Sequence, residues 1–133
     1  MCLTVYVTAS VSPPLVEWNP ERPAFNVAPL ESYDEAARRS IDAPFVVSAG
    51  AHTRCGCGFS YDDGDAELDV LRSRQSLQAY LEQILERSQV ELFVCWNGDP
   101  PQTWPPPLVV HPSELVTRED WLVENSRTRL VSS

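Results

Sequence analysis

The chain has 133 residues, enough for one domain over 1–133 that buries a core without disulfides or a metal. Its hydrophobic content of 43% and charged content of 22% are ordinary for a globular protein and argue against the disordered and fibrous classes. The formal net charge is −9 and the basic residues are scattered along the chain, so binding to nucleic acid or to an anionic membrane surface is disfavoured.

The N-terminal segment does not have the pattern of a targeting signal. MCLTVYVTASVSPP has no basic residue ahead of its apolar stretch, and it meets Pro13 too early for a signal-peptide core. No apolar run approaches the ~18 residues that a membrane-spanning helix needs. These features predict a cytoplasmic protein, in which cysteines are free thiols, metal ligands or redox groups rather than structural disulfides.

The N-terminal part of the chain predicts a strand followed by an irregular arm. Residues 3–7 alternate and are rich in β-branched side chains, which is typical of a strand. Four prolines within 11–25 exclude a regular helix or a central strand there. We therefore expect an irregular arm that is packed down by Leu15, Trp18 and Phe25.

A short helix should follow this arm. Ser32 and Glu35 have the spacing of a capping box, which predicts an amphipathic helix over 32–41 that ends before Pro44. The apolar side of that helix is expected to hold Tyr33, Ala36, Ala37 and Ile41.

Two strands and a long helix are predicted in the middle of the chain. Residues 44–50 and 55–61 have strand composition, and 51–54 can join them as a hairpin. Apolar residues spaced three and four apart then predict a helix over about 73–88, which can start as early as position 65.

The C-terminal part begins with the most apolar strand, VELFVCW at 90–96, followed by an NGD turn. The run DPPQTWPPP should be extended and exposed, in polyproline-like geometry. We expect an edge strand at 108–110, a short helical turn from Thr117 to Trp121, and a last strand at 127–131. The elements together predict an α/β fold of the α+β type, with a mixed or mainly antiparallel sheet of about five strands. One long and one shorter helix pack on that sheet, and the connections are proline-rich irregular arms.

The stretch HTRCGCGFSYDDGD, residues 52–65, gathers half of the cysteine and histidine side chains of the chain within fourteen residues. It contains two of the four cysteines, one of the two histidines and three of the five glycines. On an extended strand, Cys55 and Cys57 point to one face with Cα atoms ~6.6–6.8 Å apart, which disfavours a disulfide but suits a bridging metal. His52 lies three residues before Cys55 and can supply a third ligand. The motif therefore predicts a thiol-centred site for Zn or a similar ion.

The remaining ligand of such a site is not determined by the spacing. Cys95 is the first candidate, and Cys2 and His111 are alternatives if the topology brings them near. A single H-x-x-C-x-C motif is less specific than paired C-x-x-C motifs. A structural interpretation therefore stays open, in which the glycines shape a tight turn and the cysteines only pack.

Two other thiol chemistries stay open as weaker hypotheses. In a redox role, His52 and Arg54 would activate Cys55, but the aspartates that follow oppose this. After removal of Met1, Cys2 would carry a free α-amino group, and in that position alone the chain resembles N-terminal-nucleophile amidohydrolases. The residues LTV that follow Cys2 and the short chain depart from that family's pattern.

A different class of function needs no site chemistry. Trp104 lies in the proline-rich run and is the best candidate for an exposed aromatic side chain that binds a protein partner. The alternative to a metal site is therefore a non-catalytic interaction module with structural cysteines. The sequence does not decide between an enzyme and a binding protein.

Overall fold

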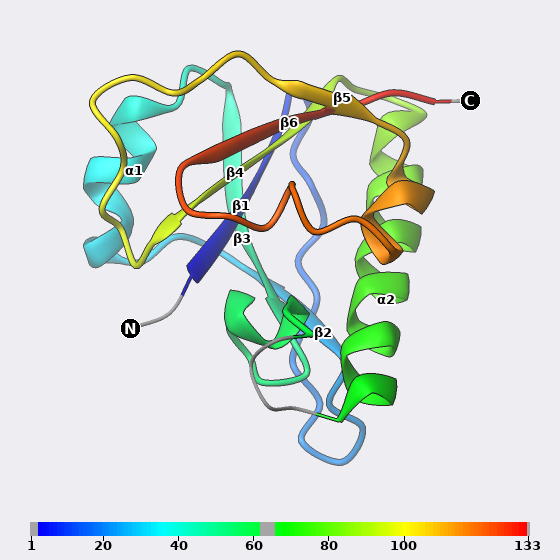
Figure 1. Cartoon of the computed structure of the whole chain (residues 1–133). Helices are drawn as coiled ribbons and strands as arrows, with labels where there is room; N and C mark the ends of the chain where they lie inside the picture. The colour runs from blue at the N-terminus through cyan, green and yellow to red at the C-terminus, as the bar shows by residue number, and fades with distance from the viewer. Residues whose placement is uncertain (1–2, 62–65, 133) are drawn as a thin grey trace.

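The computed structural model describes residues 3–61 and 66–132, which contain a six-stranded sheet with the order β2-β3-β1-β4-β6-β5 (Figure 1). All neighbouring strands are antiparallel except β5 and β6, which are parallel. The strands are β1 (Leu3–Ala9), β2 (Phe25–Ala28), β3 (Phe45–Ala51), β4 (Val90–Trp96), β5 (Leu108–Val110) and β6 (Ser126–Leu130).

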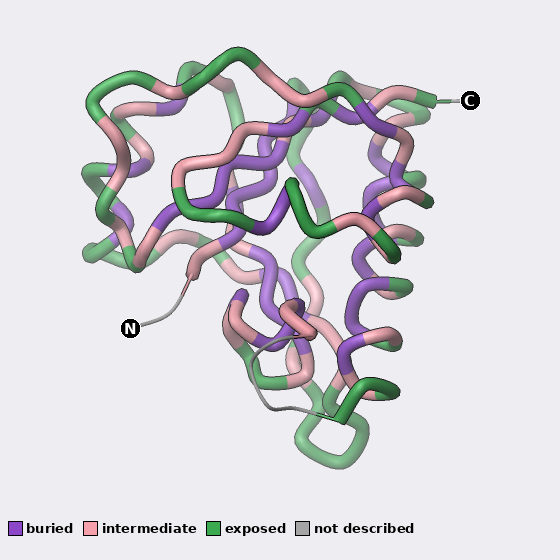
Figure 2. Tube along the Cα trace, in the orientation of Figure 1, coloured by how far each residue is buried: buried purple, intermediate pink, exposed green. Residues whose placement is uncertain are grey.

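Two helices lie on opposite faces of the sheet, and the alternation of β4 shows how the core divides between them. Val90, Leu92 and Val94 join the larger cluster under α2 (Glu67–Leu85), whereas Phe93 and Cys95 join a smaller cluster with α1 (Glu35–Ser40). Side chains alternate between faces along a strand, so the two central strands, β1 and β4, contribute to both clusters. Figure 2 shows buried residues along the central strands and on the side of α2 that faces them.

The predicted fold class is confirmed. The sheet is mixed, with antiparallel pairs in the majority, and one long and one shorter helix pack against it. The long helix starts at Glu67, close to the earlier of the two expected positions, and the strand predicted at 90–96 has those bounds.

The strand predicted at 55–61 is wrong, because its core is a 3-10 turn, η2 (Gly56–Phe59). Added side chains at the glycines would collide with the surrounding chain: a Cβ on Gly56 would lie 2.4 Å from the Leu3 carbonyl oxygen. The glycines therefore allow a compact turn to pack against β1, and this packing overrides the strand composition of Phe59 and Tyr61.

The strand that was not predicted, β2, follows directly on the proline-rich arm. Val16 pairs with Val27 through two backbone hydrogen bonds, so the arm folds back along this edge. Phe25 packs on the main core, but Leu15 is 58% exposed and does not anchor the arm as expected.

Helix starts differ from the expected positions in two places. A 3-10 turn, η1 (Ser32–Asp34), precedes α1, and its N-cap is Glu31, whose N–H donates to Asp34 Oδ2 at 2.9 Å. Tyr33 therefore faces outward and is 59% exposed. Thr117 ends the 3-10 turn η3 (Pro112–Val116) rather than starting a helical turn.

Candidate functional site

The turn that carries the two central cysteines is held by its own backbone. The Ala51 N–H donates to the Cys55 carbonyl at 2.9 Å, and the Arg54 N–H donates to the Ala51 carbonyl at 2.9 Å. Arg54 has a φ of 73°, in the left-handed region that only a minority of non-glycine residues adopt. The thiol turn, residues 51–59, is therefore a defined structure at the end of β3 and not an open loop.

Arg74 braces this turn from α2 and is fully buried. Its guanidinium donates to the carbonyls of Phe59 at 2.7 Å and Arg118 at 2.8 Å, and it pairs with Glu119 Oε2 at 2.7 Å. Sequence reasoning missed this residue. Its signal was available, since Arg74 occupies a position between Val70 and Leu77 on the apolar side of the helix, where a charged residue requires partners.

The cysteines of the turn are both half-buried and lie on either side of Gly56. Cys57 Sγ accepts a hydrogen bond from the Leu3 N–H at 3.3 Å, which places it at the start of β1. Cys55 Sγ lies 3.5 Å from Thr53 Oγ1. Cys2, which was considered as a ligand and as a nucleophile, lies outside the described residues.

His52 belongs to the same turn, but its ring is directed to α2. Its Nδ1 is 3.0 Å from Ser73 Oγ, and the same hydroxyl accepts the His52 N–H at 2.9 Å. The ring also packs near Gly58, where an added Cβ would lie 3.2 Å from His52 Cε1. In this arrangement His52 ties the turn to the helix.

The other two predicted ligands lie elsewhere. Cys95 is fully buried in the cluster on the α1 face, and burial raises the pKa of its thiol to about 11. His111 bonds through Nδ1 to the Val131 carbonyl at 2.9 Å and lines a hollow with Glu82 and Glu86 near the end of α2. Among residues 3–61 and 66–132, no group of three or more His, Cys, Asp or Glu side chains is placed to hold a metal.

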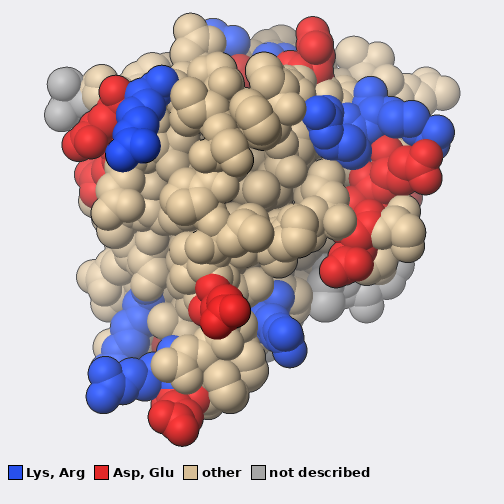
Figure 3. Space-filling view, turned by 180° about the vertical axis from the view of Figure 1, so that it is seen from behind, with Lys and Arg blue, Asp and Glu red and all other residues tan. Residues whose placement is uncertain are grey.

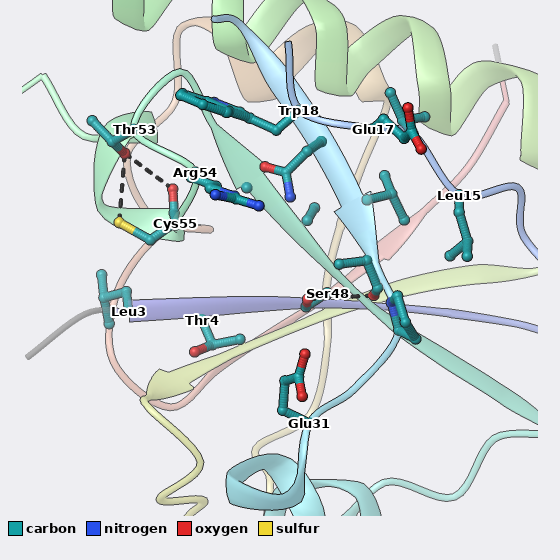
Figure 4. A pocket seen from close by; sticks show the side chains of 18 of the residues that line it. Leu3, Thr4, Leu15, Glu17, Trp18, Glu31, Ser48, Thr53, Arg54 and Cys55 are labelled. Atoms are coloured by element: carbon teal, nitrogen blue, oxygen red, sulfur yellow. Dashed lines mark hydrogen bonds between the residues drawn. The ribbon is translucent and has the colours of Figure 1, made fainter. Parts of the chain in front are cut away.

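A groove of about 850 Å³ opens beside the thiol turn (Figure 4). Its floor is the part of β1, β2 and β3 that α1 leaves uncovered, and its walls are the turn, the arm around Trp18 and the approach to α1 at Glu31. Cys55 lines this groove, whereas Cys57 does not. One of the two cysteines therefore borders the groove, with its sulfur directed to Thr53 (Figure 4).

The proline-rich segment differs from its predicted exposure. Trp104 is only partly exposed, because its ring packs edge-on against Phe93 with centroids 5.0 Å apart. Its indole N–H donates to Ser40 Oγ at 2.9 Å. This docking joins the segment to α1 and β4 and leaves less aromatic surface for a protein partner than the sequence indicates.

Charge on the surface forms small groups on the face shown in Figure 3. Uncharged side chains cover the upper middle of that face, and separate blue and red groups lie below and around this area, several of them side by side. Ion pairs bring opposite charges together elsewhere on the molecule, including Arg118 with Asp120 at 2.7 Å and Arg127 with Glu91 at 2.7 Å. No continuous basic stripe crosses the described part of this face.

Comparison of the chain with protein-family models, with curated proteins and with solved structures finds no match. In the part of the chain that the structure describes, no helix is long and apolar enough to cross a membrane. The residues of the thiol turn and the groove are therefore the basis for inferring a function.

Proposed function

We propose that this protein binds a soft metal ion, Zn²⁺ or a similar ion, through the thiolates of Cys55 and Cys57. The observation that carries the proposal is the placement of both half-buried cysteines on one glycine-shaped turn, with Cys55 among the residues that line the groove. Thiolate sulfur is the protein ligand that such ions prefer. The proposal assumes a reducing compartment such as the cytoplasm, where the thiols stay free.

The surroundings of the turn support metal binding electrostatically. Metals bind the thiolate form, and the N–H that Leu3 donates to Cys57 Sγ stabilises negative charge on that sulfur. Arg54 supplies a positive charge next to Cys55 in the chain.

His52 is the other His or Cys side chain of the turn. Cys95 is left out of the proposed site because it is fully buried in the cluster under α1. Two thiolates leave coordination positions of a Zn²⁺ ion to other ligands, since Zn²⁺ ordinarily takes four. A ligand in the groove or His52 can occupy those positions. The proposed role is therefore binding, with no reaction assigned.

The test is a Zn²⁺ titration of the reduced full-length protein against a chromophoric chelator, with native mass spectrometry to count bound ions. We expect one ion per chain, and a loss of affinity of at least tenfold in both Cys55→Ser and Cys57→Ser. Cys95→Ala is the matched control and should keep the wild-type affinity. Cys2→Ser and His52→Asn show whether either residue adds a ligand.

Thermal unfolding of each variant shows whether it is folded. A variant that has lost the Zn²⁺ ligand is thereby distinguished from one that has lost the fold. Protein that binds no Zn²⁺ above the level of the double variant Cys55→Ser/Cys57→Ser would exclude the proposal. Retained affinity in either single variant would assign the ion to other residues.

A further inference from the structure

The groove has features that the thiol proposal does not use, and they lie on the open face of the sheet. Side chains on this face alternate with the core residues Val27, Ala49 and Val5, so the floor of the groove consists of Thr4, Asn26, Ala28, Ser48 and Gly50. These side chains are small and mostly polar. They leave a hollow whose volume matches that of sites for small molecules.

Asn26, on the floor of the groove, has a buried hydrogen-bond acceptor that none of the described residues uses. Its side chain is more than nine-tenths buried, yet its Oδ1 has no hydrogen-bond partner among the described residues. The opposing residue in the sheet is Gly50, and a Cβ there would lie 2.3 Å from this oxygen. The glycine at position 50 therefore leaves space for the Asn26 carboxamide, whose oxygen can still accept a hydrogen bond.

Arg54 supplies the positive charge of the groove. Its guanidinium stacks over the Trp18 ring at 5.2 Å, and no carboxylate of the described residues lies within ion-pair distance of it. The Trp18 indole N–H donates to the His52 carbonyl at 3.2 Å, which fixes the ring on the thiol turn. A stacked guanidinium keeps its in-plane N–H groups available for a carboxylate.

The negative groups of the groove lie apart from Arg54. Figure 4 shows Arg54 and Glu31 reaching toward the middle of the hollow from different sides, with Ser48 between them, and Glu17 on the arm. The exposed apolar side chains Leu15 and Tyr33 also line the groove. This arrangement suits a ligand with a carboxylate at one end, an N–H donor at the other and an apolar body.

We propose that the groove binds a small amino-acid-like carboxylate, that is, a molecule with one carboxylate, an N–H donor and an apolar side chain. Arg54 binds the carboxylate, Trp18 and Leu15 contact the apolar body, and the N–H donor faces Asn26 and Glu31. The site does not depend on the metal, so it stands or falls separately from the proposed function.

The test uses N-acetyl-L-phenylalanine and its uncharged analogue N-acetyl-L-phenylalaninamide as probes. Each is titrated into ¹⁵N-labelled reduced protein with EDTA present, and the amide shifts of β2 and β3 give both the affinity and the location. We expect the acid to bind about tenfold or more tightly than the amide, because a charged hydrogen bond is lost in the amide. The largest shifts should fall on Asn26, Ser48 and Gly50.

Variants then identify the group that recognises charge. Arg54→Gln should reduce the affinity for the acid to that for the amide, and Arg54→Lys should restore part of it. Arg72→Gln removes the same charge from an exposed position on α2 and should change neither affinity. Equal binding of acid and amide, shifts outside the groove, or unchanged acid binding in folded Arg54→Gln protein would each overturn the proposal, as would no binding of either probe.

Discussion

Two buried polar side chains on opposite faces of the sheet, Arg74 and Asn26, differ in their hydrogen bonding. On the α2 face, the fully buried Arg74 donates to backbone carbonyls and to Glu119, and it contacts the Tyr61 and Trp121 rings at 4.4 and 5.4 Å. On the open face, Asn26 Oδ1 is without a partner among the described residues. The fully buried Arg74 therefore has protein partners, whereas Asn26 Oδ1 lies on the floor of a groove, where a ligand can supply the partner that the described residues do not.

The largest loss of stability is expected from a substitution of Arg74, on the α2 face. Arg74→Met removes the guanidinium N–H groups that donate to the carbonyls of Phe59, Leu115 and Arg118, of which only the Leu115 carbonyl has another donor among the described residues, the Trp121 indole N–H. Buried carbonyls left without a partner are costly. We expect the free energy of unfolding to fall by at least about 3 kcal/mol. Urea denaturation measures the free energy of unfolding. The control is Arg72→Met, at an exposed position of the same helix, and its stability should be within about 0.5 kcal/mol of wild type. Equal stabilities of the two variants would contradict the bracing role of Arg74.

On the open face, Gly50→Ala tests how tightly the groove floor is built. The new Cβ would lie 2.3 Å from Asn26 Oδ1 and 2.6 Å from the Arg54 carbonyl oxygen, and the carbonyl belongs to the backbone. We expect a loss of about 2–3 kcal/mol in unfolding free energy, as in other overpacked sites. Ser48→Ala, on the same floor, should cost less than about 1 kcal/mol. The comparison fails if Gly50→Ala is as stable as Ser48→Ala.

The pH dependence of stability tests the other part of this face, the part of the sheet that α1 covers. Burial raises the pKa of Cys95 from 9.0 to about 11 in the folded protein, so the folded state keeps a proton that the unfolded state loses. The stabilisation is therefore complete below pH 9 and is lost as the pH rises toward 11. Between pH 8 and 10.5 we expect Cys95 to contribute a loss on the order of 2 kcal/mol.

Cys95→Ala isolates this contribution from that of Tyr80, whose pKa is also raised by burial, to about 12. Urea denaturation at the two pH values should show a smaller loss in the variant than in the wild type. An identical loss in both proteins would show that the Cys95 thiol titrates normally.

The sequence predicted the fold better than the site, for physical reasons. The strand at 90–96 and the long helix have strong periodic patterns that tertiary contacts reinforce. The run 55–61 has strand composition, but its conformation depends on how Gly56 fits against Leu3, a contact between residues distant in the chain. No local pattern encodes that contact.

The same limit applies to the ligands. Grouping His52, Cys55 and Cys57 required only local spacing, and the structure places all three on one turn. Cys95 lies on one face of β4, and the register of the whole sheet determines which face that is. Local spacing does not contain this information. The groove could not be predicted, because its floor combines residues of β1, β2 and β3.

The central claim is that the chemically available thiols are those of the turn and that they act together. Alkylation of the reduced native protein with iodoacetamide, with and without Zn²⁺ and analysed by peptide mass spectrometry, tests it most directly. We expect iodoacetamide to label Cys55 and Cys57 in the absence of Zn²⁺, and Zn²⁺ to protect both of them. Cys95 should be labelled only after the protein is unfolded. Equal labelling of Cys55 and Cys57 with and without Zn²⁺, or labelling of Cys95 in the native protein, would contradict it.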